Sequence, residues 1–331
     1  MNPKSTWRAS AQHRFLSATE EDLKRLGGTQ LTQAQEKRMK ASLEKIEEWT
    51  QKRGETLVGE TAAAPPDTFD SRLAWPGCLP IGYVYDQANC ASDYAIAPVT
   101  TMQDRLCIIN NQQYIVELSF EDLLECCSNC GQGCPGGSVS NAWDYLNDNG
   151  VVTGGGYMNE DWCKPYFFAP CSHTGKSGIY PPCGPTALTP RCYYACPNRY
   201  YSIQYGSDHH FVNYADTINP NMITTELSTN GPVQAVMTLF QDFLTYQSGV
   251  YKHTTGTQIG TLSVKIIGYG TENGTPYWLC TNSWNETWGA QGFFKIARGT
   301  NECGIEANVV APKVNPQARK GSPFKSVKQQ S

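Results

Sequence analysis

The sequence predicts an α+β protein that carries an extra helical segment at its N-terminus. A loop over 82–89 leads into a long helix-compatible stretch that ends near Cys107. In the second half, short β-rich runs alternate with turns at 231–236, 249–251, 264–269, 277–281 and 293–297. Such spacing is typical of an antiparallel, barrel-like sheet. With 331 residues, the chain can hold one large domain or two halves packed together, plus extensions.

Composition and charge narrow the class of protein. The chain is 40% hydrophobic and carries a net charge of -4, which argues against a nucleic-acid-binding role. No apolar run is long enough to span a membrane, and no signal peptide is visible at the polar start. Fourteen cysteines indicate an oxidising compartment. We therefore expect a secreted or endolysosomal protein whose signal has been trimmed or whose start is incomplete.

The cluster Cys126-Cys127-x-x-Cys130-x-x-x-Cys134 has two interpretations. Zinc ligands usually come as two separated pairs in regular knuckles. Adjacent cysteines followed by Pro-Gly-Gly favour disulfides instead. The sequence predicts no metal site and no cofactor.

Residues 1–66 differ from the rest because they are rich in charge and contain no cysteine. Two helices are predicted, the first capped by Thr19 with Asp22 and ending at Gly27-Gly28. The second begins near Thr32, with Gln35 at the capping-box position, and runs to about residue 53. Its narrow apolar stripe predicts a face docked on the main body, with a solvated helix as the alternative. The stripe consists of Met39, Leu43, Ile46 and Trp49. A linker is predicted at 62–66.

The stretch from Gln87 to Ile96, QANCASDYAI, resembles the nucleophile segment of papain-family cysteine peptidases. The resemblance places Gln87 on the oxyanion-hole glutamine and Asp93 on the catalytic cysteine. A thiol at a helix N-terminus has a lowered pKa, and an aspartate suits the same spot as a helix cap. As a nucleophile, however, a carboxylate would form a mixed anhydride, and its charge would oppose the oxyanion. Taken alone, Asp93 would be interpreted as an ordinary helix-capping residue.

The resemblance extends to the second half of the chain. The run from Gly260 to Gly270, GTLSVKIIGYG, is similar to the segment that carries the family's catalytic histidine, and Leu262 occupies that position. Asn282-Ser283-Trp284 corresponds to the asparagine that orients the histidine and the tryptophan that shields it. The fold implied is two-lobed, with a helical left lobe and a barrel-like right lobe. Asp93 should open the main helix, Leu262 should face it, and Asn282 should find other hydrogen bonds.

Several features resemble the cathepsin B-like group. Gly136 and Gly137 match glycines that let a peptide backbone lie against the cleft wall. The region 163–205 resembles the occluding loop, in which His173 keeps one of two histidines that bind a substrate's terminal carboxylate. The resemblance therefore implies a substrate-binding role for His173, which is also expected to pair with Asp86. The loop's other anchor, an aspartate, is replaced by Thr287. Asn308 stands where an acid lines the base of the S2 pocket, so a preference for arginine there should be lost.

The resemblance also implies a disulfide pattern and a domain plan. The implied pairs are Cys78–Cys107, Cys90–Cys134, Cys126–Cys192, Cys127–Cys130, Cys163–Cys196 and Cys171–Cys183, which leaves Cys280 and Cys303 as thiols. Residues 1–66 look like a propeptide, through 6–9 and 23–29, and 67–311 form the papain-like domain. The basic, patternless tail 312–331 is predicted to be disordered.

These substitutions predict a cathepsin B-like homologue without peptidase activity, because removing one member of a nucleophile–base pair already costs orders of magnitude. It would bind a peptide, a cystatin-like inhibitor or another protein in its cleft, and its own N-terminal segment would compete. One alternative is an active peptidase that uses Cys90 with His173 or His209-His210. Another is a secreted matrix or adhesion protein that uses its surface and tail. Assays on peptide substrates and pull-downs with cleft-directed inhibitors separate the three.

Overall fold

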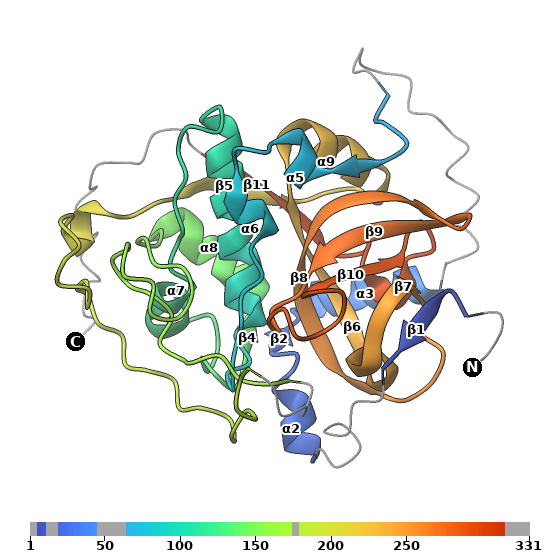
Figure 1. Ribbon diagram of the computed structural model, residues 1–331, viewed down its shortest axis with the longest axis horizontal. Helices are drawn as coiled ribbons and strands as arrows, with labels where there is room; N and C mark the ends of the chain where they lie inside the picture. Colours follow the sequence, from blue (N-terminus) through green and yellow to red (C-terminus); the bar gives the residue numbers. More distant parts are fainter. Residues whose placement is uncertain (1–4, 11–18, 45–63, 174–178, 315–331) are drawn as a thin grey trace.

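A computed structural model describes residues 5–10, 19–44, 64–173 and 179–314, which fold into a helical lobe and a sheet lobe (Figure 1). The helical lobe contains α6 (Asp93–Ile109), α7 (Phe120–Cys126) and α8 (Val139–Asp148). The sheet lobe lies against α6 through β8 (Gln258–Glu272). The predicted α+β fold with two lobes is confirmed.

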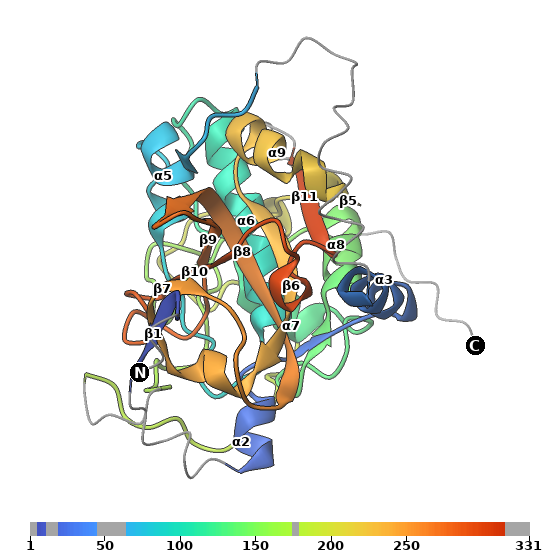
Figure 2. The same ribbon diagram turned by 90° about the vertical axis from the view of Figure 1, so that its right-hand side faces the viewer.

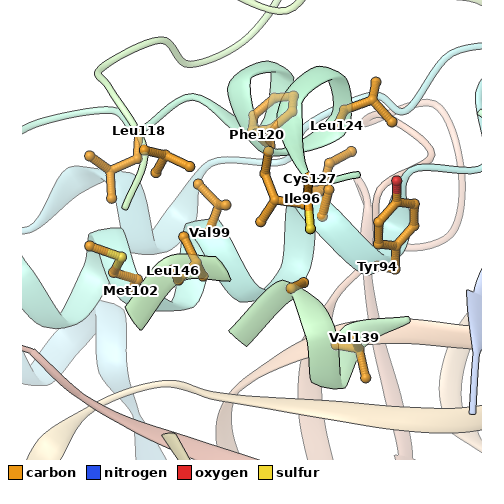
Figure 3. Packing of buried hydrophobic residues seen from close by; sticks show 14 of the residues in the cluster. Tyr94, Ile96, Val99, Met102, Leu118, Phe120, Leu124, Cys127, Val139 and Leu146 are labelled. Carbon is orange, nitrogen blue, oxygen red and sulfur yellow. The ribbon is translucent and has the colours of Figure 1, made fainter. Parts of the chain in front are cut away.

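Helix α6 runs through the centre of the molecule, because every residue from Asp93 to Cys107 is buried. Its side chains Val99 and Met102 pack with Phe120 of α7 and Leu146 of α8 in one apolar cluster (Figure 3). Burying apolar side chains of this size stabilises the fold by roughly 1.5–3 kcal/mol each. The start of α6 is therefore held rigidly, which fixes the position of Asp93.

The main sheet follows the order β1-β7-β10-β9-β8-β6-β11-β5, and its pairs are antiparallel except for the parallel pair β10–β7. The five predicted β-rich runs fall in β6 to β10. Strand β8 is much longer than the predicted 264–269. The strands on this path are β1 (Trp7–Ala9), β7 (Tyr246–Tyr251), β10 (Phe293–Ala297), β9 (Thr275–Thr281), β8, β6 (Val233–Phe240), β11 (Val309–Val314) and β5 (Val212–Thr217).

Buried ion pairs join the two lobes. Lys265 Nζ of β8 lies 2.6 Å from Asp104 Oδ2 of α6, and both side chains are almost fully buried. Arg105 of α6 pairs with Glu226 of α9 (Ile223–Asn230) and also donates to the Pro312 carbonyl. Strand β11 continues through Val314, so residues 312–314 belong to the sheet, and the predicted start of the tail at 312 is wrong. Residues 315–331 lie outside the described residues.

Short elements complete the main body. They are β3 (Phe69–Asp70), α5 (Ser71–Ala74), β4 (Gly137–Ser138) and the 3-10 helices η2 (Leu79–Gly82), η3 (Tyr205–Ser207), η4 (Pro220–Met222), η5 (Gln241–Thr245) and η6 (Glu302–Gly304). Among the described residues, every helix is too short or too polar to cross a membrane.

Six disulfides join the pairs implied by the family resemblance. They are Cys78–Cys107, Cys90–Cys134, Cys126–Cys192, Cys127–Cys130, Cys163–Cys196 and Cys171–Cys183. Cys280 and Cys303 are buried thiols. All four cysteines of the 126–134 cluster are therefore used in disulfides, which leaves no thiolates for the alternative zinc site.

The N-terminal segment packs against the main body at several points. Strand β1 extends the sheet beside β7, with Trp7 packed on Tyr246 and Tyr251. Helix α2 (Glu20–Lys24) and α3 (Gln33–Glu44) follow, joined by β2 (Thr29–Gln30), which lies between the lobes (Figures 1 and 2). Both predicted capping boxes are present, Thr19 with Asp22 and Thr32 with Gln35.

Of the predicted docking stripe, Met39 is buried and lies beside Thr238 of β6 and Gly304 of η6. The side chains of Leu43, Ile46 and Trp49 lie outside the described residues. Met39 is the one residue of the stripe whose side chain the structure describes, and its burial agrees with a docked helix. The alternative of a solvated helix does not hold at this residue.

The loop region after α8 is anchored by Lys164. Its Nζ lies 2.8 Å from Asp122 Oδ1 and 3.1 Å from Glu125 Oε2, both on α7, and donates to the Tyr193 carbonyl at 2.6 Å. We expect Lys164→Met to lower the free energy of unfolding by about 3–5 kcal/mol, because it leaves a buried carboxylate unpaired. Denaturant titration checks this, with the exposed Lys313→Met as the control that should change stability by less than about 0.5 kcal/mol. Equal effects of the two variants would contradict the role given to Lys164.

Candidate active-site cleft

Asp93 is the first residue of α6 and points toward the N-terminal segment. Its carboxyl group is fully buried and accepts hydrogen bonds from Gly28 N at 2.6 Å, Thr29 Oγ1 at 2.6 Å and Ser263 N at 2.8 Å. The N-cap residue of α6 is Ser92. The helix-capping interpretation of Asp93 is therefore wrong, because its carboxyl group binds a segment that lies 64 and 65 residues earlier in the chain.

The environment of Asp93 changes its acidity. Burial raises the pKa of Asp93 to about 6, although the hydrogen bonds from Thr29, Ser263 and Gly28 act in the opposite direction. Desolvation disfavours the charged carboxylate, whereas donors favour it. The group therefore changes charge within the range between lysosomal and neutral pH.

Leu262 lies in β8 next to Ser263, whose backbone N–H reaches Asp93. This hydrogen bond brings the part of β8 that carries Leu262 up to the start of α6. The Leu262 side chain is fully buried in the apolar cluster of the sheet lobe, which also contains Leu26 of the N-terminal segment. A leucine cannot accept a proton, so this position offers no general base.

The polar groups that surround the two substituted positions bind the N-terminal segment. Gln87 Nε2 donates to the Arg25 carbonyl at 2.8 Å, and Trp284 Nε1 donates to the Leu26 carbonyl at 3.1 Å. Gln87 is oriented by Ser283 Oγ, which donates to its Oε1 at 2.6 Å. The amide that matches the oxyanion-hole glutamine is thus occupied by a main-chain carbonyl.

The segment crosses the cleft in an extended conformation. Gly137 N donates to the Gly28 carbonyl at 2.9 Å, and β2 pairs in parallel with β4. On the opposite side, Gly28 forms a β-bridge with Thr261 of β8. A peptide backbone therefore lies against Gly136 and Gly137, as the sequence suggested. A groove of about 490 Å³ continues beyond Thr29 along α3.

Asn282 keeps only part of its hydrogen bonding. Its Oδ1 accepts from Ser283 N at 2.8 Å, but its buried Nδ2 has no partner among the described residues. The expectation that Asn282 would find other hydrogen bonds is therefore met at Oδ1 but not at Nδ2. An unpaired buried donor costs free energy, so structural hydrogen bonding alone does not explain this residue.

The side chains of Asn308 and His173 are both buried, so neither is exposed to a ligand in this structure. Asn308 Nδ2 donates to the Gln35 carbonyl of α3 at 3.2 Å, so the N-terminal segment covers this position. His173 is 1% exposed, stacks on Trp284, and its Nε2 lies 2.6 Å from Asp86 Oδ1, which is the expected pairing. Burial acts to raise the pKa of Asp86, but His173 and its other donors outweigh it and hold the pKa below its ordinary value.

The residues named for an alternative catalytic mechanism are engaged elsewhere. Cys90 is bonded to Cys134 and is not a free thiol. His209 and His210 contact Tyr205 and Tyr114, whereas His253 pairs with Asp242; His13 lies outside the described residues. The group Cys171, His173 and Cys183 has the proximity of a metal site, but its two sulfurs form a disulfide.

The contacts of Asp93 with Gly28, Thr29 and Ser263 were not predicted from the sequence. Residues 23–29 were predicted to be part of a propeptide-like segment that would compete for the cleft, but no contact with Asp93 was assigned to them, and Ser263 was given no role. The signal was the Gly-Gly-Thr run itself. A β-carbon at Gly28 would overlap the Ala91 carbonyl, and one at Gly27 would overlap the Thr261 carbonyl.

The fold and the cleft are those of a papain-like protein. The family model of the papain family cysteine proteases matches residues 65–313, and the chain belongs to this family. It is similar to cathepsin B-like members of the family. Cathepsin B-like cysteine proteinase 4 of Caenorhabditis elegans is 46% identical over 254 residues, covering 75% of this chain and 76% of that protein. A cathepsin B-like cysteine proteinase of Schistosoma japonicum is 43% identical over 249 residues, covering 74% and 72%.

Solved structures that include a pro-segment align with nearly the whole chain. ProCathepsin B S9 from Trypanosoma congolense superposes with a TM-score of 0.73 at 27% identity, covering 95% of this chain and 94% of that one. Digestive procathepsin L 3 of Tenebrio molitor, with a TM-score of 0.62 and 18% identity, shares the fold.

Proposed function

We propose that this cathepsin B-like protein has no peptidase activity and uses its cleft to bind peptide segments. One observation carries the proposal: the position of the nucleophile holds the carboxyl group of Asp93, and the position of the base holds Leu262. Covalent catalysis of this type needs a nucleophile and an adjacent base within hydrogen-bond reach. Neither is available, and Cys90 is held in a disulfide.

The binding function is supported by the groups that remain. Gln87, Trp284 and Gly137 all donate to main-chain carbonyls of the N-terminal segment. These contacts do not depend on the nucleophile or the base, so they could hold a peptide or an inhibitor in the same way. Six disulfides suit a secreted or endolysosomal location.

The S2 position should not favour arginine once the segment has left. Asn308 offers a neutral amide, which cannot form the charge-assisted pair that typically adds about 1.5–3 kcal/mol. In a peptide-binding screen, we expect arginine to have no advantage at this subsite, and Asn308→Glu to create one. An arginine preference of the unchanged protein would contradict the proposed role.

The test of the proposed function uses the purified full-length chain. Active members of the family release their propeptide by cutting themselves at acidic pH, as the resemblance implies. We expect this protein to remain full length over days at pH 5 and at any concentration. Adding an unrelated protease should cut it near the 62–66 linker. Trimming that accelerates with protein concentration, without added protease, would overturn the proposed function.

A further inference from the structure

The chain's own Leu26–Thr29 lies extended in the cleft, and we propose that Asp93 selects this segment by its glycine–glycine–threonine sequence. This inference rests on the proposed function, because it needs a cleft that holds a peptide without cutting it. It gives the substituted nucleophile position a role of its own.

The threonine is selected by its hydroxyl group. Thr29 is 4% exposed, and its Oγ1 donates to Asp93 Oδ2 at 2.6 Å, the oxygen that Ser263 N also reaches. A valine of the same shape would leave that oxygen with one donor fewer. A buried hydrogen bond contributes about 1 kcal/mol, which corresponds to a five- to tenfold change in binding. Serine would keep the hydroxyl group and should be accepted.

The two glycines are selected by space. A β-carbon at Gly28 would overlap both the carbonyl and the β-carbon of Ala91, just before α6. A β-carbon at Gly27 would overlap the carbonyl of Thr261 in β8. The segment lies between the backbones at Ala91 and Thr261. Only a residue without a side chain allows Gly28 N to approach Asp93 Oδ1 to 2.6 Å.

The leucine and the main chain fix the register. Leu26 is 4% exposed and lies in the apolar cluster that contains Leu262, so a polar residue there would be buried without a partner. Its carbonyl accepts from Trp284 Nε1, and the Gly28 carbonyl accepts from Gly137 N. The Thr29 carbonyl accepts from Thr261 Oγ1. These contacts hold the four residues in one position.

The first experiment measures hydrogen exchange of residues 25–30 in the full-length chain at pH 5. We expect Thr29→Val and Asp93→Ala each to raise the exchange rate about tenfold, while amides of α8 stay unchanged. In the double variant, the combined effect on the free energy of opening should be smaller than the sum of the two single effects, because both substitutions break the same hydrogen bond. Fully additive effects would overturn the role of Asp93.

The second experiment supplies the segment as a separate peptide. In full-length Gly28→Ala the segment no longer fits, so the cleft should bind a labelled peptide of the chain's residues 22–32 by fluorescence polarisation. Gly206→Ala is the matched control, because a β-carbon there meets open space, and it should bind no peptide. The peptide with valine for Thr29 should bind about tenfold more weakly, and the one with alanine for Gly28 about a hundredfold more weakly.

The outcomes separate this inference from the proposed function. Equal affinities for the threonine and valine peptides, without hydrolysis, would overturn the selection by Asp93 and leave the proposed function standing. Hydrolysis of the peptide would overturn the proposed function itself. If Gly28→Ala does not fold, the exchange experiment decides alone.

Discussion

Replacing Asp93 by cysteine and Leu262 by histidine together is expected to create peptide-hydrolysing activity, whereas either substitution alone should not. The nucleophile and the base act as a unit, so either one without the other contributes little. Their supporting groups are already present. Gln87 Nε2 is placed to bind an oxyanion once the segment leaves, and Asn282 Nδ2 has no hydrogen-bond partner among the described residues.

We expect the double variant to exceed either single variant by at least about a thousandfold in hydrolysis of a fluorogenic dipeptide substrate. The assay should follow removal of residues 1–66 by an added protease that is then inhibited. The double variant with Gln87→Ala is the control for the oxyanion contact and should lose about a hundredfold of the gain. Activity in the Leu262→His variant alone would show that some other nucleophile operates in the cleft.

Acidification is expected to tighten the hold on the N-terminal segment. The pKa of Asp93 is raised to about 6 when the segment covers it, and burial is the main cause. When the segment leaves, water reaches the carboxyl group and its pKa should fall toward the ordinary value of 3.8. The covered state therefore binds more protons, so covering is strongest below pH 4 and is weakened as pH rises through 6. The total change is at most about a hundredfold.

Hydrogen exchange of residues 25–30 in the native protein and in Asp93→Asn checks this sign. The ratio of the two rates at each pH removes the intrinsic pH dependence of exchange. From pH 7.5 to 4.5, protection of the native protein should rise relative to the variant. Other charged groups nearby are paired in ways that do not involve the segment's contact with Asp93: Lys265 with Asp104, and Arg25 with Asp22. Protection that falls on acidification would contradict the prediction.

The sequence predicted those features that depend on local chemistry or on family register. The capping boxes at Thr19 and Thr32 follow from neighbouring residues, and they are present. The β-rich runs were found because alternation is a local property. Strand β8 was predicted too short because its two ends, 258–263 and 270–272, consist mostly of polar residues and glycine. Lys265 lies inside the predicted run and is buried, since Asp104 of α6 pairs with it.

The partners of Asp93 could not be predicted, because they depend on how distant segments meet. Local propensity makes an aspartate at a helix start a cap, and only the approach of Gly28 and Thr29 gives its carboxyl group other donors. His173 was expected to face a ligand, yet its stacking on Trp284 buries it. The resemblance to the family gave the position of each residue in the fold, but it did not show which residues cover that position.

The most direct test of the central claim is the rate of peptide hydrolysis by the unchanged protein after its N-terminal segment has been removed. The added protease should be blocked by an inhibitor that does not act on papain-like peptidases, and the cleared protein should be checked by mass. With Asp93 and Leu262 in place, we expect no hydrolysis of a mixed peptide library at pH 5 or pH 7 above an inhibitor-only control, although peptides still bind. Turnover that disappears in a variant of a cleft residue such as Gln87→Ala would contradict the claim that this cleft binds without cutting.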